Sequence, residues 1–161
     1  MTRDERFAEM ARIHAGSVLA YLRRRHYGDG STGPEDVLAD VLIVAWRRFD
    51  DIPEGLEAPW LFGVARRCLA NDRRKTRRRR AFIMQLRPSD GGPSAEDEVM
   101  ADFALAQALD ALSETEREVL LLASWEGLNP TELAAALGVS ENAAAVRLSK
   151  AKAKLKTKLM D

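Results

Sequence analysis

Apolar residues recur at three- and four-residue intervals along nearly the whole chain, a periodicity that predicts amphipathic α-helices. The first such pattern begins near Phe7 and stops before Gly28, where a polar, glycine-containing loop follows. A second helix is expected to begin at Pro34, because proline suits the first turn of a helix. A third runs from about Trp60 into Arg80. No segment alternates apolar and polar residues over a useful length, so we expect an all-α fold.

Proline, glycine and serine interrupt this pattern at residues 87–94, which carry turn formers and no apolar periodicity. Helical periodicity resumes after this stretch and continues to the end of the chain. The sequence therefore predicts two small helical domains, at 1–80 and 96–161, joined by a flexible linker at 81–95.

The second predicted domain carries signals for where its helices begin and end. Ser113 to Glu116 has the spacing of a capping box, in which each of the two side chains accepts a backbone hydrogen bond at a helix start. Trp125 is expected among the buried residues of this helix, and Gly127 is expected to end it. Asn129 can cap the next helix, with Pro130 in its first position.

A helix-turn-helix is predicted next. Two short helices that cross steeply need small residues at the crossing and a turn that tolerates positive φ. Ala134 is small at the crossing, and Gly138 turns the chain. Val139 is expected to plug the core and Ser140 to cap the second helix, which should run from Glu141 through Leu155 or beyond.

The apolar side chains of this second helix are expected to pack inward, which leaves its basic side chains for DNA. The inward set is Leu148, Ala151, Leu155 and Leu159. The DNA-facing set is Arg147, Lys150, Lys152 and Lys154. An ordinary helical hairpin with a solvated lysine tail is the alternative, but the cap, the glycine turn and the basic second helix together favour binding to duplex DNA.

The net charge is zero, yet the charges separate along the chain. Residues 1–80 carry 17 basic and 12 acidic side chains, whereas residues 81–112 carry one basic and six acidic side chains. Residues 113–161 carry seven of each, with the bases concentrated from Arg147 onward. Two basic ends therefore flank an acidic connector. Because local basic patches set the affinity for phosphates, this distribution is compatible with nucleic-acid binding.

Several other classes of protein find no support in the sequence. No apolar run approaches the length of a membrane span, and Met1 to Met10 lacks the apolar stretch of a signal peptide. Cys68 is the single cysteine, so we expect no disulfide, no metal or cofactor, and a cytoplasmic protein. A small helical enzyme would have to use Cys68, His14 or His26, which show no nucleophile–base or metal-ligand spacing.

Two separate sets of motifs resemble one known family. Residues 35–49 (EDVLADVLIVAWRRF) and 59–67 (PWLFGVARR) resemble region two of the extracytoplasmic-function sigma factors, in the sigma-70 family. Residues 111–122 (ALSETEREVLLL), followed by the helix-turn-helix, resemble region four. The order and spacing also match, and the resemblance covers almost the whole chain. It implies a non-enzymatic, dissociable subunit of bacterial RNA polymerase that directs promoter-specific transcription initiation.

The resemblance implies that region two grips the coiled coil of the largest polymerase subunit, and reads and opens the minus-ten element. The polymerase contact would lie on the helix that carries Asp36, Asp40 and Arg47, although the family often has Gln where this chain has Ala39. The loop Asp50 to Ala58 and the start of the next helix would hold a flipped base beside a basic groove. The implied minus-ten contacts are Asp50, Asp51, Arg66, Arg67, Asn71, Arg74 and Lys75, and Arg73 belongs to the same basic wall.

Two further features of region two have open interpretations. The run Arg77 to Arg80 either neutralises phosphates without reading sequence or is a disordered basic linker; the two are compatible. Trp46 and Trp60 can stack on bases, but their apolar neighbours favour packing in the core.

Region four, by the same resemblance, binds the minus-thirty-five element as duplex and sits on the flap of the second-largest polymerase subunit. The implied DNA contacts are Ser140, Asn142, Ala145, Val146, Arg147, Ser149, Lys150, Lys152 and Lys154. The family often presents Thr, Arg and Ser where this chain has Ala143 to Val146. Alanine can meet a thymine methyl but cannot donate a hydrogen bond, so directional readout rests on the polar residues Asn142, Arg147, Ser149 and Lys150. We therefore expect a sequence preference unlike the family's usual one, or a weaker one.

The alternative to a sigma factor is a transcriptional regulator that uses the helix-turn-helix alone. Such a regulator would need a sensor or a dimerisation domain, and residues 1–80 show neither a ligand-binding β pattern nor a phosphoacceptor pattern. No sensor domain follows the helix-turn-helix before Asp161, so any regulation is expected to come from a separate partner such as an anti-sigma factor.

Overall fold

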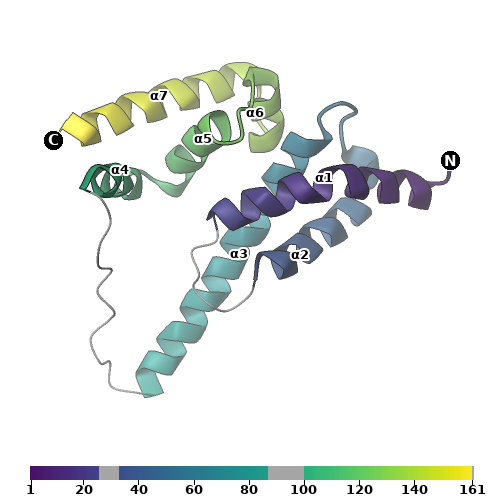
Figure 1. Ribbon diagram of the computed structural model, residues 1–161, viewed down its shortest axis with the longest axis horizontal. Coiled ribbons are helices and arrows are strands. Elements are labelled where there is room, and N and C mark those ends of the chain that lie inside the picture. Colours follow the sequence, from purple (N-terminus) through teal and green to yellow (C-terminus); the bar gives the residue numbers. More distant parts are fainter. Residues whose placement is uncertain (26–32, 87–99, 161) are drawn as a thin grey trace. The chain divides into compact units, whose positions relative to one another are not determined.

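The computed structural model describes residues 1–25, 33–86 and 100–160, and the chain forms two compact units, Met1–Pro88 and Ser89–Asp161. Within the described residues the elements are seven α-helices and one short 3₁₀ turn, with no strand (Figure 1). The predicted all-α fold is therefore confirmed. No helix in this part of the chain combines the length and the apolar character that crossing a membrane requires.

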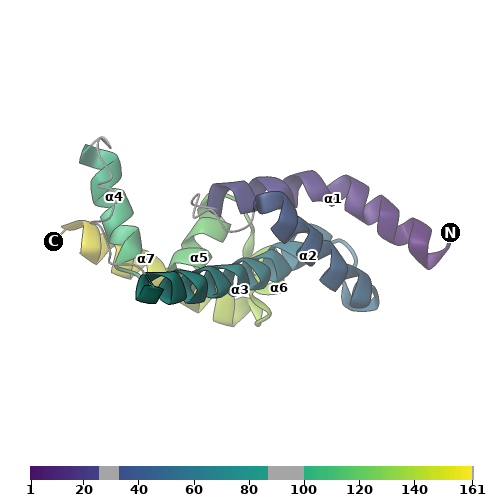
Figure 2. The same cartoon turned by 90° about the horizontal axis from the view of Figure 1, so that it is seen from below.

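The first unit packs three helices together: α1 (Arg3–Arg25), α2 (Pro34–Arg47) and α3 (Glu57–Leu86). The 3₁₀ turn η1 (Phe49–Asp51) lies between the last two helices. Each helix contacts the other two, and Figure 2 shows the group from below. Their facing side chains bury an apolar core that includes Val18, Tyr21, Leu22, Val37, Val41, Leu61 and Ala65.

Helix α2 begins with Pro34 in its first turn, as predicted. Helix α3 is longer than predicted at both ends, since it begins before Trp60 and continues past Arg80 to Leu86. The sequence has no glycine or proline between Gly63 and Pro88, so nothing in it stops the helix at Arg80. Residues 81–86, predicted to belong to the linker, are instead helical.

Three sequence predictions concern residues outside the described ranges. They are the polar loop around Gly28, the position of His26 and the remaining linker residues 87–95.

The second unit contains α4 (Met100–Asp110), α5 (Glu114–Ser124), α6 (Pro130–Leu137) and α7 (Glu141–Met160). Helix α7 contacts each of the other three, so it is the centre of the unit. Part of its inward face joins α4 and α5 in one apolar cluster, formed by Leu109, Leu112, Leu120, Leu148, Ala151 and Leu155.

The predicted N-terminal caps of α5 and α6 and the glycine turn after α6 are confirmed, whereas the predicted end of α5 at Gly127 is wrong, because α5 ends at Ser124. The Ser113 hydroxyl accepts a hydrogen bond from the Glu116 backbone N–H at 3.1 Å, and the Glu116 carboxylate accepts one from the Ser113 N–H at 2.9 Å. Asn129 and Glu132 form a second capping box at the start of α6. Gly138 ends α6 with a φ of +68°, the left-handed conformation that glycine adopts without a steric penalty.

Two residues of the second unit were predicted to be buried and are not. Trp125 is 50% exposed, because α5 ends at Ser124 and Trp125 lies just beyond its last turn. Leu159 is 49% exposed, because it lies one turn past Leu155, the last residue of α7 in the apolar cluster. Both errors come from extending a helical pattern beyond the residues that the neighbouring helices cover.

Candidate nucleic-acid interface

The exposed face of α3 carries a stripe of four polar side chains. Arg67, Asn71, Arg74 and Lys75 are all exposed, and their spacing of three to four residues places them on one side of the helix. We call these four residues the α3 stripe. The structure therefore brings together four of the residues predicted to contact the minus-ten element, and three of them are cationic.

Two other arginines of α3 lie off this stripe. Arg73 is half-buried and donates a hydrogen bond through Nη2 to the backbone carbonyl of Arg25 at 2.5 Å, so it caps the end of α1 rather than lining the exposed face. Arg66 is also half-buried, and its Nε is buried without a hydrogen-bond partner among the described residues.

The two acids of η1 that were predicted to contact the minus-ten element each face an arginine. Arg3 Nε lies 3.9 Å from Asp50 Oδ1, and Arg48 Nε lies 3.4 Å from Asp51 Oδ2. Both carboxylate side chains are more than half exposed. The first pair joins α1 to η1, which residue spacing alone does not indicate.

Aromatic rings surround these arginines. The Arg3 guanidinium lies 4.3 Å from the centre of the Trp46 ring, and its Nη2 donates to the Trp46 backbone carbonyl at 2.6 Å. Phe7 meets the same ring edge-on, with centroids 5.2 Å apart. Arg48 lies 5.4 Å from the Trp60 ring. Trp46 thus packs against Phe7 and Arg3, but it is 39% exposed. It is therefore less buried than the predicted packing in the core would require.

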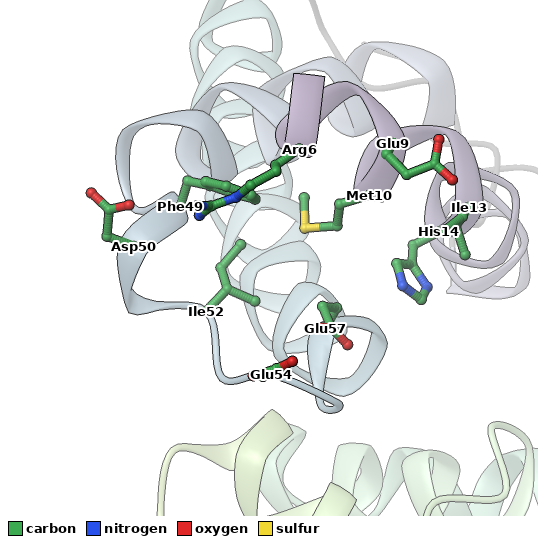
Figure 3. Close-up of a pocket in the computed structure, with 10 residues that line it drawn as sticks. All are labelled: Arg6, Glu9, Met10, Ile13, His14, Phe49, Asp50, Ile52, Glu54 and Glu57. Carbon is green, nitrogen blue, oxygen red and sulfur yellow. The ribbon is translucent and has the colours of Figure 1, made fainter. Parts of the chain in front are cut away.

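The loop after η1 borders a groove of about 730 Å³ whose other wall is α1 (Figure 3). Met10 is at its centre, and Arg6 lies over the Phe49 ring at 5.3 Å. Carboxylates line much of the rim, at Glu9, Asp50, Glu54 and Glu57. The resemblance placed a base pocket between this loop and the start of α3; the hollow in the structure has α1 as its second wall, which sequence reasoning missed.

A second exposed face lies on α2 and contains the predicted polymerase contacts. Asp36, Asp40 and Arg47 are exposed, and their spacing of four and seven residues places them on one side of the helix. Ile43 lies between them on that side and is 49% exposed. Ile43 is not among the polymerase contacts expected from the sequence. Its position outside the buried pattern of α2 could have indicated that it is exposed.

The start of α7 presents the predicted reading residues of the helix-turn-helix. The Ser140 hydroxyl accepts a hydrogen bond from the Ala143 N–H at 3.1 Å, which confirms the predicted cap. Asn142, Val146 and Ser149 are exposed at helical spacing, with Ala145 also exposed beside them, whereas the neighbouring Ala144 is fully buried. Arg147 and Lys150 are exposed one position further round the helix.

The lysines of α7 differ in their surroundings. Lys154 Nζ donates to Glu116 Oε1 at 3.1 Å, so it ties α7 to the capping box of α5. The pKa of Glu116 is lowered, first by the hydrogen bond from the Ser113 backbone and then by Lys154. Within the described part of the chain, Lys150 and Lys152 have no ion-pair partner.

The residues that would support an enzyme are separated in the structure. His14 lines the groove on α1, whereas Cys68 is half-buried on α3. Burial, followed by the charge of Asp40, raises the pKa of the Cys68 thiol, which disfavours the nucleophilic thiolate. Among residues 1–25, 33–86 and 100–160, no three His, Cys, Asp or Glu side chains gather as a metal site would need.

Comparison with known proteins gives one family match and several relatives. Residues 102–155 match the family model for sigma-70, region 4. The chain is 32% identical over 159 residues to the RNA polymerase sigma factor NccH of Alcaligenes xylosoxydans xylosoxydans, an alignment that covers 92% of this chain and 84% of NccH. It is 30% identical over 140 residues to the ECF RNA polymerase sigma factor SigL of Mycobacterium tuberculosis, with 84% and 78% covered.

Solved structures show the same fold. The chain matches CnrH, solved in complex with the cytosolic domain of CnrY, with a TM-score of 0.56 and 30% identity over 98% of this chain and 89% of that one. It also matches the sigma factor RpoE of Bartonella quintana, solved with the anti-sigma factor NepR, with a TM-score of 0.59, 22% identity and coverage of 97% and 98%. From these relatives, the chain belongs to the extracytoplasmic-function sigma factors of the sigma-70 family.

Proposed function

We propose that this sigma factor divides promoter recognition between its two units, the first binding core polymerase and opening the minus-ten element, the second binding the minus-thirty-five element as duplex. Family membership already makes the chain a factor that directs transcription by RNA polymerase, and not an enzyme. A regulator that acts without polymerase and a small helical enzyme are both set aside on the same ground.

The α3 stripe is the observation that carries the proposal. A basic helix face can follow the backbone of a released strand, and an amide between the cations can hydrogen-bond a base edge. In this interpretation Arg67, Arg74 and Lys75 contact phosphates, and Asn71 contacts a base. The exposed run Arg77 to Arg80 continues the positive charge along the same helix.

The α2 face is proposed to bind the coiled coil of the largest polymerase subunit. Asp36 and Asp40 supply negative charge, Arg47 supplies a hydrogen-bond donor, and Ile43 supplies apolar contact area between them. Protein interfaces commonly have an apolar centre and a polar rim. An exposed aliphatic side chain among charged residues fits this arrangement, because the partner can bury the aliphatic side chain while the charged residues around it stay in contact with water.

The exposed start of α7 is proposed to read the minus-thirty-five duplex in the major groove. Asn142, Arg147, Ser149 and Lys150 can donate hydrogen bonds to base edges or phosphates. Ala145 and Val146 offer only apolar contact, for example with a thymine methyl group. Ser140 and Lys152 are proposed to contact phosphates. The same unit is proposed to rest on the flap of the second-largest polymerase subunit.

An anti-sigma factor is proposed as the separate regulatory partner. CnrH, 30% identical to this chain in the structural alignment, was solved with the cytosolic domain of CnrY. That similarity supports a partner of the same kind here.

Selection of bound DNA from a random library tests the proposal. Core polymerase alone and core polymerase with this protein would each be incubated with the library, and the retained duplexes sequenced. We expect two separated sequence blocks only with the protein, the upstream block differing from the family's usual one because alanines occupy the reading positions of α7. Identical retained pools with and without the protein would contradict the proposal.

A further inference from the structure

The 3₁₀ turn η1, which precedes the loop at the groove, is contacted by two arginines, one from α1 and one that directly precedes the turn. Arg3, in the first turn of α1, faces Asp50, and Arg48, at the end of α2, faces Asp51. Each arginine also lies over an aromatic ring, Arg3 over Trp46 at 4.3 Å and Arg48 near Trp60 at 5.4 Å. The two acids predicted to face DNA are therefore both held within the protein.

The Arg3 guanidinium makes contacts with two successive elements. Its Nη2 donates to the Trp46 carbonyl, which lies in the last turn of α2, while its Nε faces Asp50 in η1. Phe7 adds contacts to the rings of both Trp46 and Phe49 from the next turn of α1. A planar guanidinium with several fixed partners orients what it contacts better than a single point charge does.

These contacts are too exposed to contribute much to folding stability. The Asp50 side chain is 78% exposed and that of Asp51 is 63% exposed, and ion pairs in such positions are screened by water. They instead join α1 and the residue before η1 to the two acids of the turn from which the loop leaves. That loop forms one wall of the groove opposite α1.

We propose that Arg3 and Arg48 are positioning residues for strand opening, which hold the Asp50–Asp51 turn so that the following loop is preorganised to receive the released base. This inference rests on the proposed function of the loop. Neither arginine needs to touch DNA. If the loop is already ordered before DNA binds, promoter opening does not have to include the entropy loss of ordering it.

The test compares variants in holoenzyme on a promoter recovered by the library selection. Opening would be followed in time by permanganate reactivity of unpaired thymines, with Arg3→Ala, Arg3→Lys and Arg48→Ala. Arg23→Ala is the matched control, since Arg23 also joins α1 to α2, through an exposed ion pair of 3.1 Å with Glu35 at the other end of the two helices. Affinity for core polymerase and thermal unfolding would be measured for every variant.

A second template separates positioning from a general defect. Abasic sites are first placed one at a time in the non-template strand, and promoter opening by the wild-type protein is measured for each. The second template carries the abasic site that slows this opening most, so that no base is left to capture. We expect Arg3→Ala and Arg48→Ala to slow opening roughly twofold to fivefold on the intact promoter, the range given by losing an exposed cation–π contact. Arg3→Lys, which keeps the charge, should fall between. On the abasic template each variant should match the wild type, and Arg23→Ala should match it on both.

The outcomes separate the inference from the function on which it rests. If no abasic substitution slows the wild type, the loop captures no base, and the proposed function and this inference both fail. If an abasic site does slow the wild type, the proposed function stands. The inference then fails if the two variants behave like Arg23→Ala, or if they slow both templates equally.

Discussion

At the scale of single residues, the structure separates cations that are free to meet DNA from cations that the fold already uses. Arg73 caps α1 and Lys154 holds α5, whereas Arg67 and Lys150 point to solvent at helical positions only a few residues away. The sequence alone treats these residues alike, because the partner in each case comes from a different helix.

The lysines of α7 should therefore contribute unequally to DNA binding. Lys150→Ala should weaken binding to the minus-thirty-five duplex by about threefold to tenfold at roughly 0.1 M salt. The slope of log affinity against log salt concentration should become shallower by about one. Lys154→Ala should change the affinity less than about twofold, because its ammonium is held by Glu116. Titrations of holoenzyme at several salt concentrations measure both, and equal losses for the two variants would show that Lys154 leaves Glu116 to bind DNA.

The Glu116–Lys154 pair also predicts a pH dependence. A carboxylate whose pKa is lowered in the folded state stabilises the protein above its ordinary pKa of 4.5, and this contribution is lost as the pH falls through the lowered value. Lys154→Ala removes part of the lowering, so its stability should fall less than that of the wild type on going from pH 6 to about pH 3. Thermal unfolding across this range tests it, with Lys152→Ala expected to follow the wild type.

Ile43 is the residue of the α2 face that should matter most for polymerase affinity. Ile43→Ala removes an apolar side chain from the proposed interface, and we expect a loss of about 1–2 kcal/mol, or roughly tenfold in Kd for core polymerase. Ile13→Ala is the matched control, because Ile13 is 54% exposed on α1, outside the α2 face. Unchanged affinity with Ile43→Ala, or an equal loss with both, would remove Ile43 from the interface.

At the scale of elements, the sequence predicted most of the fold because its signals are local. Capping boxes, the proline at the start of α2 and the glycine after α6 act within a few residues, and all are found in the structure. The errors arise where burial depends on a neighbour: Trp125 and Leu159 continue an apolar pattern past the reach of the packed helices. Helix α3 is longer than predicted, because its sequence has no glycine or proline between Gly63 and Pro88 to end it at Arg80.

The turn of the helix-turn-helix gives the sharpest test at this scale. Gly138 has a φ of +68°, so Gly138→Ala forces a side chain into the left-handed region and should destabilise the second unit by about 1 kcal/mol. Gly16→Ala is the opposite case, because Gly16 lies inside α1 with open space around its Cα, and alanine favours helices there by up to about 1 kcal/mol. In denaturant unfolding, the midpoint concentration should be lower than that of the wild type for Gly138→Ala and higher for Gly16→Ala. A neutral Gly138→Ala would mean that the turn relaxes freely.

At the scale of the whole molecule, we propose that the two units use different surfaces for different forms of DNA. The α3 stripe suits a single strand, and the start of α7 suits a major groove. Sequence reasoning expected both surfaces, from the family resemblance together with charge and spacing. It missed the arginine contacts at η1 and the α1 wall of the groove, because Arg3 and Asp50 are 47 positions apart and only the packing of α1 on α2 brings them together.

The division of labour between the units is the central claim, and one binding measurement tests it most directly. Holoenzymes carrying either Arg67→Ala, Arg74→Ala and Lys75→Ala together, or Arg147→Ala with Lys150→Ala, would be titrated with two DNAs. One is a single-stranded minus-ten oligonucleotide and the other a minus-thirty-five duplex. We expect the α3 variant to lose at least about tenfold affinity for the single strand and less than about twofold for the duplex, with the reverse for the α7 variant. Equal losses of both variants on both DNAs would contradict the account.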